Sequence, residues 1–147
     1  MGVIEAIGAG PVGIDTVAFI YFIEEHPRYL PVVEPIFAAM ASGRMRGVTS
    51  GVTLLEALVV PYRARDMTIA AQYELLLTRS KGLVLVELDR QLLRDAAQLR
   101  AVSSMRTPDA LQVAAALRER CTVFITNDRD LRSVAGMEVV QLSDHGA

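Results

Sequence analysis

The sequence predicts an α/β fold, a three-layer α/β/α sandwich around a central, mostly parallel sheet. Two observations predict it. Short apolar runs such as residues 83–86 and 122–126 are typical of strands that are covered on both faces. Between such runs lie longer segments with apolar residues at helical spacing, among them residues 66–80. Strands that alternate with helices along a chain favour a parallel sheet with helices on both sides.

The first half of the chain is expected to hold two strands and three helices. Ser50 is a residue type that caps helices, and a proline such as Pro61 is expected to end one. In chain order, the predicted elements are a strand over 12–15, a helix over 16–25, a helix over 32–41, a strand over 46–49 and a helix from Ser50 to Pro61.

The second half continues the alternation. Asp89 is a cap residue, and Thr107 followed by Pro108 is a typical helix start. In order, we predict a helix over 66–80, a strand over 83–86, a helix after Asp89, a helix from Thr107-Pro108, a strand over 122–126, a short helical turn and a strand over 138–140.

Composition limits the class of protein. The chain has 147 residues, which suits a single domain, with the glycine-containing residues 1–11 as a flexible lead-in. Hydrophobic residues make up 52%, which excludes an intrinsically disordered chain. The net charge of -2 excludes a surface that is basic all over, but not a local basic groove. One cysteine, Cys121, excludes a disulfide scaffold. No segment has the pattern of a leader or a membrane span, so a cytoplasmic protein without membrane contact is expected.

Four acidic residues stand where a parallel sheet would bring side chains together. Ligands of open α/β sheets bind beyond the carboxyl ends of the strands. Asp15 ends the first predicted strand, and Asp128 follows the strand over 122–126. Asp109 lies in the first turn of a predicted helix, and Glu56 lies within another among apolar neighbours. A parallel arrangement would let all four converge on one crevice.

Each acid also has a purely structural explanation. Asp15 and Asp128 are residue types that cap helices and turns. Asp109 suits the positive end of a helix dipole, and Glu56 suits a solvated helix face. The functional hypothesis therefore depends on the set rather than on any single residue.

A cluster of carboxylates predicts a hard divalent cation. Close carboxylates raise each other's pKa and repel, and a cation relieves that repulsion. Carboxylate and water ligands are those that Mg²⁺ and Mn²⁺ prefer, whereas His26 and His145, the only histidines, lie outside these motifs. One or two ions held by carboxylates suit the hydrolysis of a phosphodiester.

Four fragments in order resemble the PIN-domain nucleases, in particular the VapC-type toxins of toxin–antitoxin pairs. They are residues 13–16, 50–56, 106–111 and 126–131, and each carries one of the four acids. The resemblance covers nearly the whole chain. It implies a Mg²⁺- or Mn²⁺-dependent endoribonuclease that cleaves RNA, forms a homodimer and is blocked by a small antitoxin protein.

The resemblance also implies roles for individual residues. Three acids would hold the ion and the fourth would complete the site; they are Asp15, Asp109, Asp128 and Glu56. Polar neighbours would orient those carboxylates, namely Thr16, Thr126 and Asn127, with Asp130 either assisting or starting a helix. Arg106 is a candidate contact for an RNA phosphate. Gln112 stands where the family commonly has histidine, and Leu131 where it commonly has phenylalanine, which leaves the RNA target open.

Three other classes of protein compete with this hypothesis. A HAD-like phosphatase needs a second aspartate two residues after the first, but Val17 stands there, and a receiver domain needs an early acidic pair that is absent. A catalytically silent binding module would not use the acids, and an unused cluster of carboxylates would only destabilise the fold.

Overall fold

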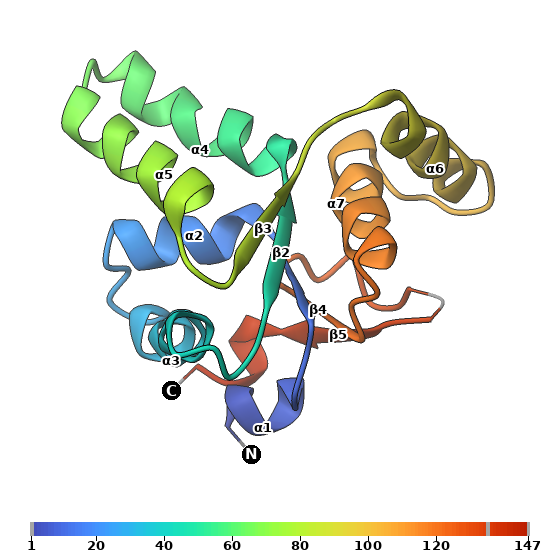
Figure 1. The fold of residues 1–147 in the computed structure, drawn as a ribbon, viewed down its shortest axis with the longest axis horizontal. Coiled ribbons are helices and arrows are strands. Elements are labelled where there is room, and N and C mark those ends of the chain that lie inside the picture. The colour runs from blue at the N-terminus through green and yellow to red at the C-terminus, as the bar shows by residue number, and fades with distance from the viewer. Residues whose placement is uncertain (1, 135, 147) are drawn as a thin grey trace.

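The structure, a computed structural model, describes residues 2–134 and 136–146. Five strands form one sheet in the order β3-β2-β1-β4-β5, and all four neighbouring pairs run parallel (Figure 1). The strands are β1 (Val12–Ile14), β2 (Gly47–Ser50), β3 (Leu83–Val86), β4 (Val123–Thr126) and β5 (Glu138–Gln141). This arrangement confirms the predicted α/β fold with a parallel central sheet.

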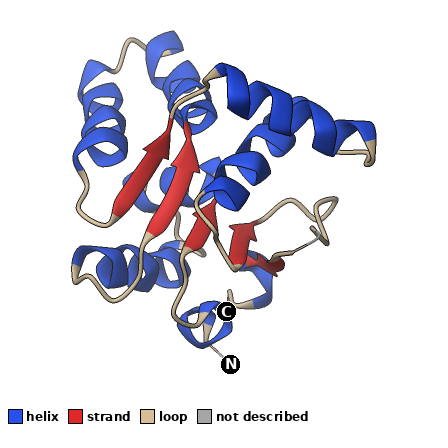
Figure 2. Ribbon diagram, turned by 45° about the vertical axis from the view of Figure 1, so that its right-hand side comes forward, coloured by secondary structure: helices blue, strands red, loops and turns tan. Residues whose placement is uncertain are grey.

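Helices cover both faces of the sheet. In Figure 1, α6 and α7 lie on one side of the strands and α2 to α5 lie on the other, and Figure 2 shows the strands between these layers. The helices are α1 (Val3–Ile7), α2 (Thr16–Ile23), α3 (Leu30–Ala41), α4 (Gly51–Arg63), α5 (Met67–Arg79), α6 (Arg90–Ala101), α7 (Thr107–Arg118) and the 3₁₀ turn η1 (Leu142–Asp144).

The strand side chains alternate between two cores. Val123 and Ile125 of β4 pack with α1, α2 and α3, whereas Phe124 points to the other side and packs with α6 and α7. Val12 and Ile14 of β1 belong to the first core. The period of two is that of a strand buried on both faces, which is why these runs contain almost no polar residues.

Gly13 lets helix α7 lie close against the sheet. A Cβ atom at residue 13 would be 2.7 Å from Cβ of Ala116 and 2.7 Å from Cδ1 of Phe124. The face of α7 toward the sheet is accordingly built of small residues, with Ala110, Ala114 and Ala116 almost completely buried. This close packing brings the first turn of α7 near the end of β1.

Several element boundaries differ from the sequence-based predictions. Pro61 does not end its helix, because α4 continues to Arg63 with Pro61 buried in the last turn. Arg106 rather than Thr107 occupies the cap position of α7, so Thr107 is the first helical residue. The run over 83–86 forms the edge strand β3, and only Val86 is fully buried.

The connection between β4 and β5 also differs. No helical turn forms in the described residues between these strands, and the short 3₁₀ turn η1 follows β5 instead. Asp130 therefore does not start a helix.

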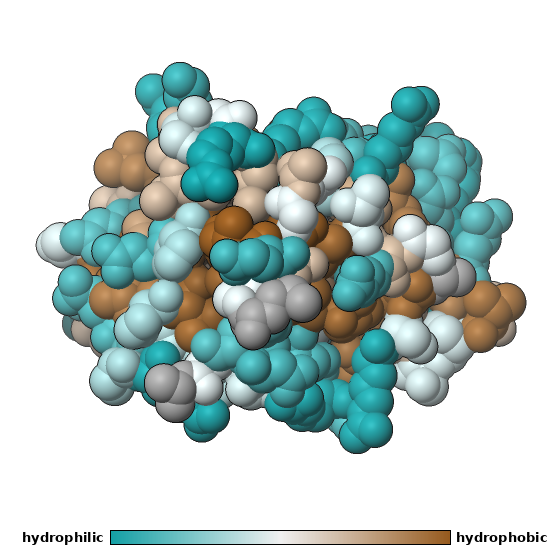
Figure 3. Space-filling model, turned by 90° about the horizontal axis from the view of Figure 1, so that it is seen from below, coloured by the Kyte–Doolittle hydropathy of each residue, from teal (hydrophilic) through white to brown (hydrophobic). Residues whose placement is uncertain are grey.

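The amino-terminal residues expected to form a flexible lead-in include a short helix. Val3 and Ile7 of α1 are buried against the first core, while Met1 lies outside the described residues. The view from below shows hydrophilic residues around patches of hydrophobic ones (Figure 3). Among the described residues, no helix combines the length and the apolar character needed to cross a membrane.

Candidate active site

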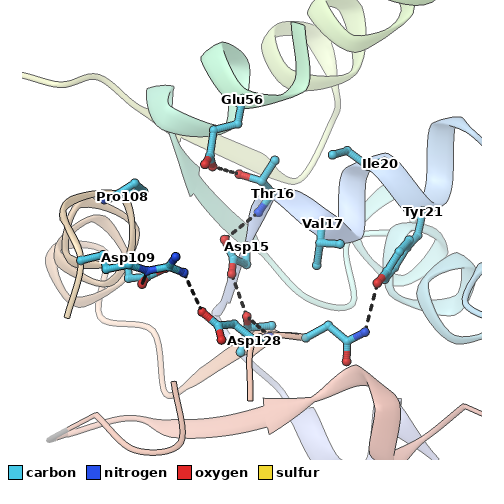
Figure 4. A pocket seen from close by; sticks show the side chains of 12 residues that line it. Asp15, Thr16, Val17, Ile20, Tyr21, Glu56, Pro108, Asp109 and Asp128 are labelled. Atoms are coloured by element: carbon cyan, nitrogen blue, oxygen red, sulfur yellow. Dashed lines mark hydrogen bonds and ion pairs between the residues drawn. The ribbon is translucent and has the colours of Figure 1, made fainter. Parts of the chain in front are cut away.

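The four predicted acids line one pocket. It has a volume of about 480 Å³ and lies where β1 and β4 end (Figure 4). Asp15 and Asp128 enter it from the ends of these strands, Glu56 from α4 and Asp109 from the first turn of α7. Four distant parts of the sequence thus meet at the carboxyl edge of the sheet, as the parallel topology requires.

Asp15 is partly buried, and both of its carboxylate oxygens accept hydrogen bonds. One carboxylate oxygen accepts a hydrogen bond from the backbone N–H of Thr16 at 2.9 Å, and the other accepts from the hydroxyl of Thr126 at 2.7 Å. Burial raises the pKa of Asp15, the negative charges of Asp109 and Glu56 raise it further, and the two hydrogen bonds oppose the rise. Asp15 also caps α2, so its structural and functional explanations are both compatible with the geometry.

Glu56 lies on α4 with an exposed side chain, and its carboxylate accepts a hydrogen bond from Thr16, the residue after Asp15. Its Oε1 atom lies 2.6 Å from the hydroxyl of Thr16. Thr16 therefore contacts two of the four acids, through its backbone N–H to Asp15 and through its hydroxyl to Glu56.

Arg106 joins the other two acids. Its Nε lies 3.4 Å from Oδ2 of Asp109, and its Nη2 lies 3.1 Å from Oδ2 of Asp128. The two negative charges raise the pKa of the guanidinium. The Arg106 side chain is 74% exposed, so the bridge lies at the mouth of the pocket.

The predicted orienting residues have different positions. Thr126 donates to Asp15 and accepts from the backbone N–H of Asp128 at 3.1 Å, so it links two acids. Asn127 instead donates to the hydroxyl of Tyr21 at 3.0 Å and accepts from the backbone N–H of Ser143 at 3.0 Å, so its side chain does not hydrogen-bond a pocket acid. Asp130 donates its backbone N–H to Asp128 at 2.9 Å, and its side chain lines a neighbouring hollow.

Sequence reasoning missed two features of the site. Tyr21 lines the pocket and accepts a hydrogen bond from Asn127. Its ring stacks on that of Tyr29, with the ring centroids 4.6 Å apart. A buried polar network also lies beneath the acids, and it consists of Thr16, Thr49, Ser50, Thr53 and Gln112. The signal for it was the hydroxyl residues at the end of a predicted strand and one turn later on the following helix, facing a glutamine in an alanine-rich helix.

The family is shown by a comparison of the sequence with protein-family models. The model described as PIN domain matches residues 12–137, which include all four acids. The chain belongs to the PIN-domain family. No curated protein matches its sequence.

Solved structures show the same fold as this PIN domain. A chain of VapBC2 from Rickettsia felis bound to a promoter DNA fragment is 14% identical, with a TM-score of 0.69 over 88% of this chain and 97% of that one. VapC20 from Mycobacterium tuberculosis, a sarcin–ricin-loop-cleaving toxin, is 12% identical with a TM-score of 0.66 over 86% and 98%. A chain of DNA-bound VapBC from Salmonella typhimurium is 20% identical, with a TM-score of 0.61 over 89% and 97%.

The side chains that line the pocket of this PIN domain are of the type that binds a hard divalent cation. The pocket is lined by four carboxylates and by no histidine or cysteine. Within the described part of the chain, no three histidine, cysteine or acidic side chains are already gathered in a metal-binding arrangement. Thr16 bonds Oε1 of Glu56, whereas Arg106 bridges Asp109 and Asp128, so ligation by all four acids requires the guanidinium to leave these two aspartates.

Proposed function

We propose that this PIN domain is a metal-dependent endoribonuclease and the toxin of a toxin–antitoxin pair. One observation carries the proposal: four carboxylates from four parts of the chain line a single pocket in a PIN fold. Four carboxylates in one pocket repel one another, and the raised pKa of Asp15 reflects burial together with that repulsion. A protein that only binds a partner would not need four mutually repelling carboxylates in one pocket.

The proposed ligands of a Mg²⁺ or Mn²⁺ ion are Asp15, Glu56, Asp109 and Asp128. PIN-domain nucleases in general use divalent metal ions, which supports this assignment. When bound, such an ion activates water for attack on a phosphodiester and neutralises negative charge that develops on the phosphate.

The chain's own residues have distinct parts in the proposed reaction. Thr126 and the backbone of Thr16 fix the orientation of Asp15, since each donates to a different carboxylate oxygen. Arg106, exposed at the mouth of the pocket, is placed to bind an RNA phosphate through its guanidinium once it leaves the two acids.

RNA is proposed as the substrate on the basis of the relatives. VapC20, which shares this fold over 86% of the chain, cleaves the sarcin–ricin loop. At 12% identity the likeness does not carry over a target sequence, so the proposal extends to RNA as a class and not to a particular site.

An antitoxin partner and a homodimer are proposed for a similar reason. Two of the structural relatives are toxin–antitoxin assemblies bound to DNA. Helices α4 and α5 expose large apolar side chains, namely Leu55, Val60, Met67 and Leu75, each more than 60% exposed. Such residues are typical of surfaces that a protein partner covers.

Cleavage of a panel of structured RNAs by the purified protein tests the proposal. The assay runs with Mg²⁺, with Mn²⁺ and with EDTA, and Asp15→Asn is the matched variant because it removes a carboxylate while preserving the size of the side chain. Cuts that require metal and disappear in Asp15→Asn are expected. Absence of both cleavage and Mn²⁺ binding in the wild-type protein would contradict the proposal and favour a silent binding module.

A further inference from the structure

Beneath the acids, the amide of Gln112 is almost completely buried. Gln112 is 2% exposed and comes from α7, a helix whose face toward the sheet is otherwise apolar. It is surrounded by four hydroxyl groups that are also buried, those of Thr16, Thr49, Ser50 and Thr53. Burying an amide is costly unless its polar atoms are bonded, and here both are bonded.

The backbone fixes which way this amide points. The backbone N–H of Ser50 lies 3.2 Å from one terminal atom of Gln112, and because an N–H only donates, that atom is the oxygen. The Ser50 hydroxyl, 2.8 Å from the same atom, also donates to it. The amide nitrogen must then face the other side, where it donates to Thr53 at 2.7 Å and to Thr16 at 3.2 Å.

The hydroxyl of Thr16 can therefore be assigned a direction. An ionised carboxylate only accepts, so Thr16 donates its single hydroxyl hydrogen to Glu56 at 2.6 Å. Thr16 accepts in turn from Gln112. The bonds run one way, from the Gln112 amide through the Thr16 hydroxyl to the Glu56 carboxylate, and bonds aligned in this manner strengthen one another.

A second branch of the network leads away from the acids. Thr53 accepts from Gln112 and lies 2.6 Å from Thr49, whose hydroxyl donates to the backbone carbonyl of Ile14 at 2.9 Å. This branch ends on the backbone of β1. Thr49 is as buried as Gln112 and its hydroxyl lies 3.5 Å from the Gln112 amide oxygen, but it makes no hydrogen bond to Thr16 or to Glu56.

We propose that Gln112 is a positioning residue for Glu56 and acts through Thr16. Glu56 has a long, exposed side chain on α4, and among the described residues the hydrogen bond from Thr16 is the one that holds it. Gln112 occupies the lone-pair side of the Thr16 hydroxyl and directs its hydrogen toward the carboxylate. The inference rests on the proposed function, in which Glu56 is a metal ligand.

Titration calorimetry with Mn²⁺, without RNA, tests the proposal. Gln112→Met removes the amide at similar volume, and Thr16→Val removes the hydroxyl. Each is expected to weaken Mn²⁺ binding about tenfold, as loss of a residue that orients a metal ligand does. Because Gln112 and Thr16 act on Glu56 through the same hydrogen bond, the double variant should also lose about tenfold in Mn²⁺ affinity rather than about a hundredfold. Thr16→Ser, which keeps the hydroxyl, should bind as the wild type does.

Thr49→Val is the matched control. It removes a buried hydroxyl from the same network and is expected to lower the melting temperature, while Mn²⁺ affinity stays within about twofold of wild type. Unchanged Mn²⁺ binding in Gln112→Met overturns the proposal, as does an equal loss in Thr49→Val, which would show a general structural role. If Gln112→Met does not fold, a comparison of Mn²⁺ binding by Thr16→Val and Thr16→Ser tests the same route at the Thr16 hydroxyl.

The same titration separates this inference from the proposed function. A wild-type protein that binds no Mn²⁺ contradicts the proposed function, and the role of Gln112 is then overturned with it. A wild-type protein that binds Mn²⁺ and cleaves RNA, beside a Gln112→Met variant that binds Mn²⁺ equally well, overturns the role of Gln112 alone.

Discussion

Arg106 Nη2 lies 3.1 Å from Oδ2 of Asp128, so a cation of the chain itself occupies acids that we propose as metal ligands. The same guanidinium reaches Asp109 at 3.4 Å. It neutralises part of the negative charge of the pocket when no other cation does so. A divalent ion that binds these carboxylates must compete with Arg106, and displacement would leave the guanidinium available for a phosphate.

Arg106→Ala is therefore expected to change metal binding and RNA cleavage in opposite directions. Without the competing guanidinium, Mn²⁺ should bind about two- to fivefold more tightly, the range expected for an exposed ion pair. Cleavage at saturating Mn²⁺ should fall, because a phosphate contact is lost. Calorimetry and the RNA assay measure the two effects. Arg118→Ala, which removes an ion pair with Asp89 outside the pocket, should change neither, and weaker Mn²⁺ binding in Arg106→Ala would contradict competition.

Asp15→Asn is expected to stabilise the metal-free protein at neutral pH. Burial raises the pKa of Asp15 above its ordinary value of 3.8, so the native state binds this proton more tightly than the unfolded state. Between 3.8 and the raised pKa, stability consequently falls as pH rises, and the ionised form destabilises the fold at pH 7. The variant should melt about 2–4 °C higher at pH 7.

The pH dependence is the check on that explanation. The increase in melting temperature caused by Asp15→Asn should shrink as pH falls through the raised pKa of Asp15. It should be absent below pH 3.8, where Asp15 is protonated in both the native and the unfolded state. Thermal unfolding in EDTA from pH 3 to pH 7 measures this. A gain of equal size at every pH would show that the charge of Asp15 is not its cause.

The sequence was informative about backbone order and much less about side-chain partners. The four acids could be placed at one edge of the sheet, because parallel topology alone brings the ends of β1 and β4 together. Asn127 was expected to orient an acid, but its bond to Tyr21 depends on how α2 packs, which periodicity does not encode. Pro61 was expected to end a helix, but α4 continues past it to Arg63. Gln112 could be noticed but not placed.

Gly13→Ala tests the close approach of α7 to the sheet. The added methyl group would lie 2.7 Å from carbon atoms of Ala116 and Phe124, well inside contact distance. Relief requires α7 or the ring to shift, and overpacking of this kind costs about 1–3 kcal/mol. Because α7 also carries Asp109, we expect lower unfolding free energy together with weaker Mn²⁺ binding. Urea unfolding and calorimetry measure these, and a variant as stable as the wild type would show that the layers are not tightly packed here.

Asp89 stabilises helix α6 and does not line the pocket. Its carboxylate caps α6 by accepting from the backbone N–H of Leu92 at 2.8 Å, and it pairs with Arg118 through bonds of 2.8 and 2.9 Å. The bonds from Arg118 and Leu92 lower the pKa of Asp89 to about 2. A lowered native pKa contributes stability that is present above 3.8 and is lost as pH falls toward 2.

Asp89→Ala should therefore lower the melting temperature at pH 7 by about 2–4 °C through loss of the cap and the ion pair. The difference from wild type should narrow between pH 4 and pH 2, as the wild-type carboxylate itself becomes protonated. Asp89→Asn keeps a cap acceptor without the charge and should fall between the two. Since Asp89 does not line the pocket, Mn²⁺ affinity should be unchanged in both variants. A pH-independent difference in melting temperature would assign the effect to helix propensity rather than to the charge.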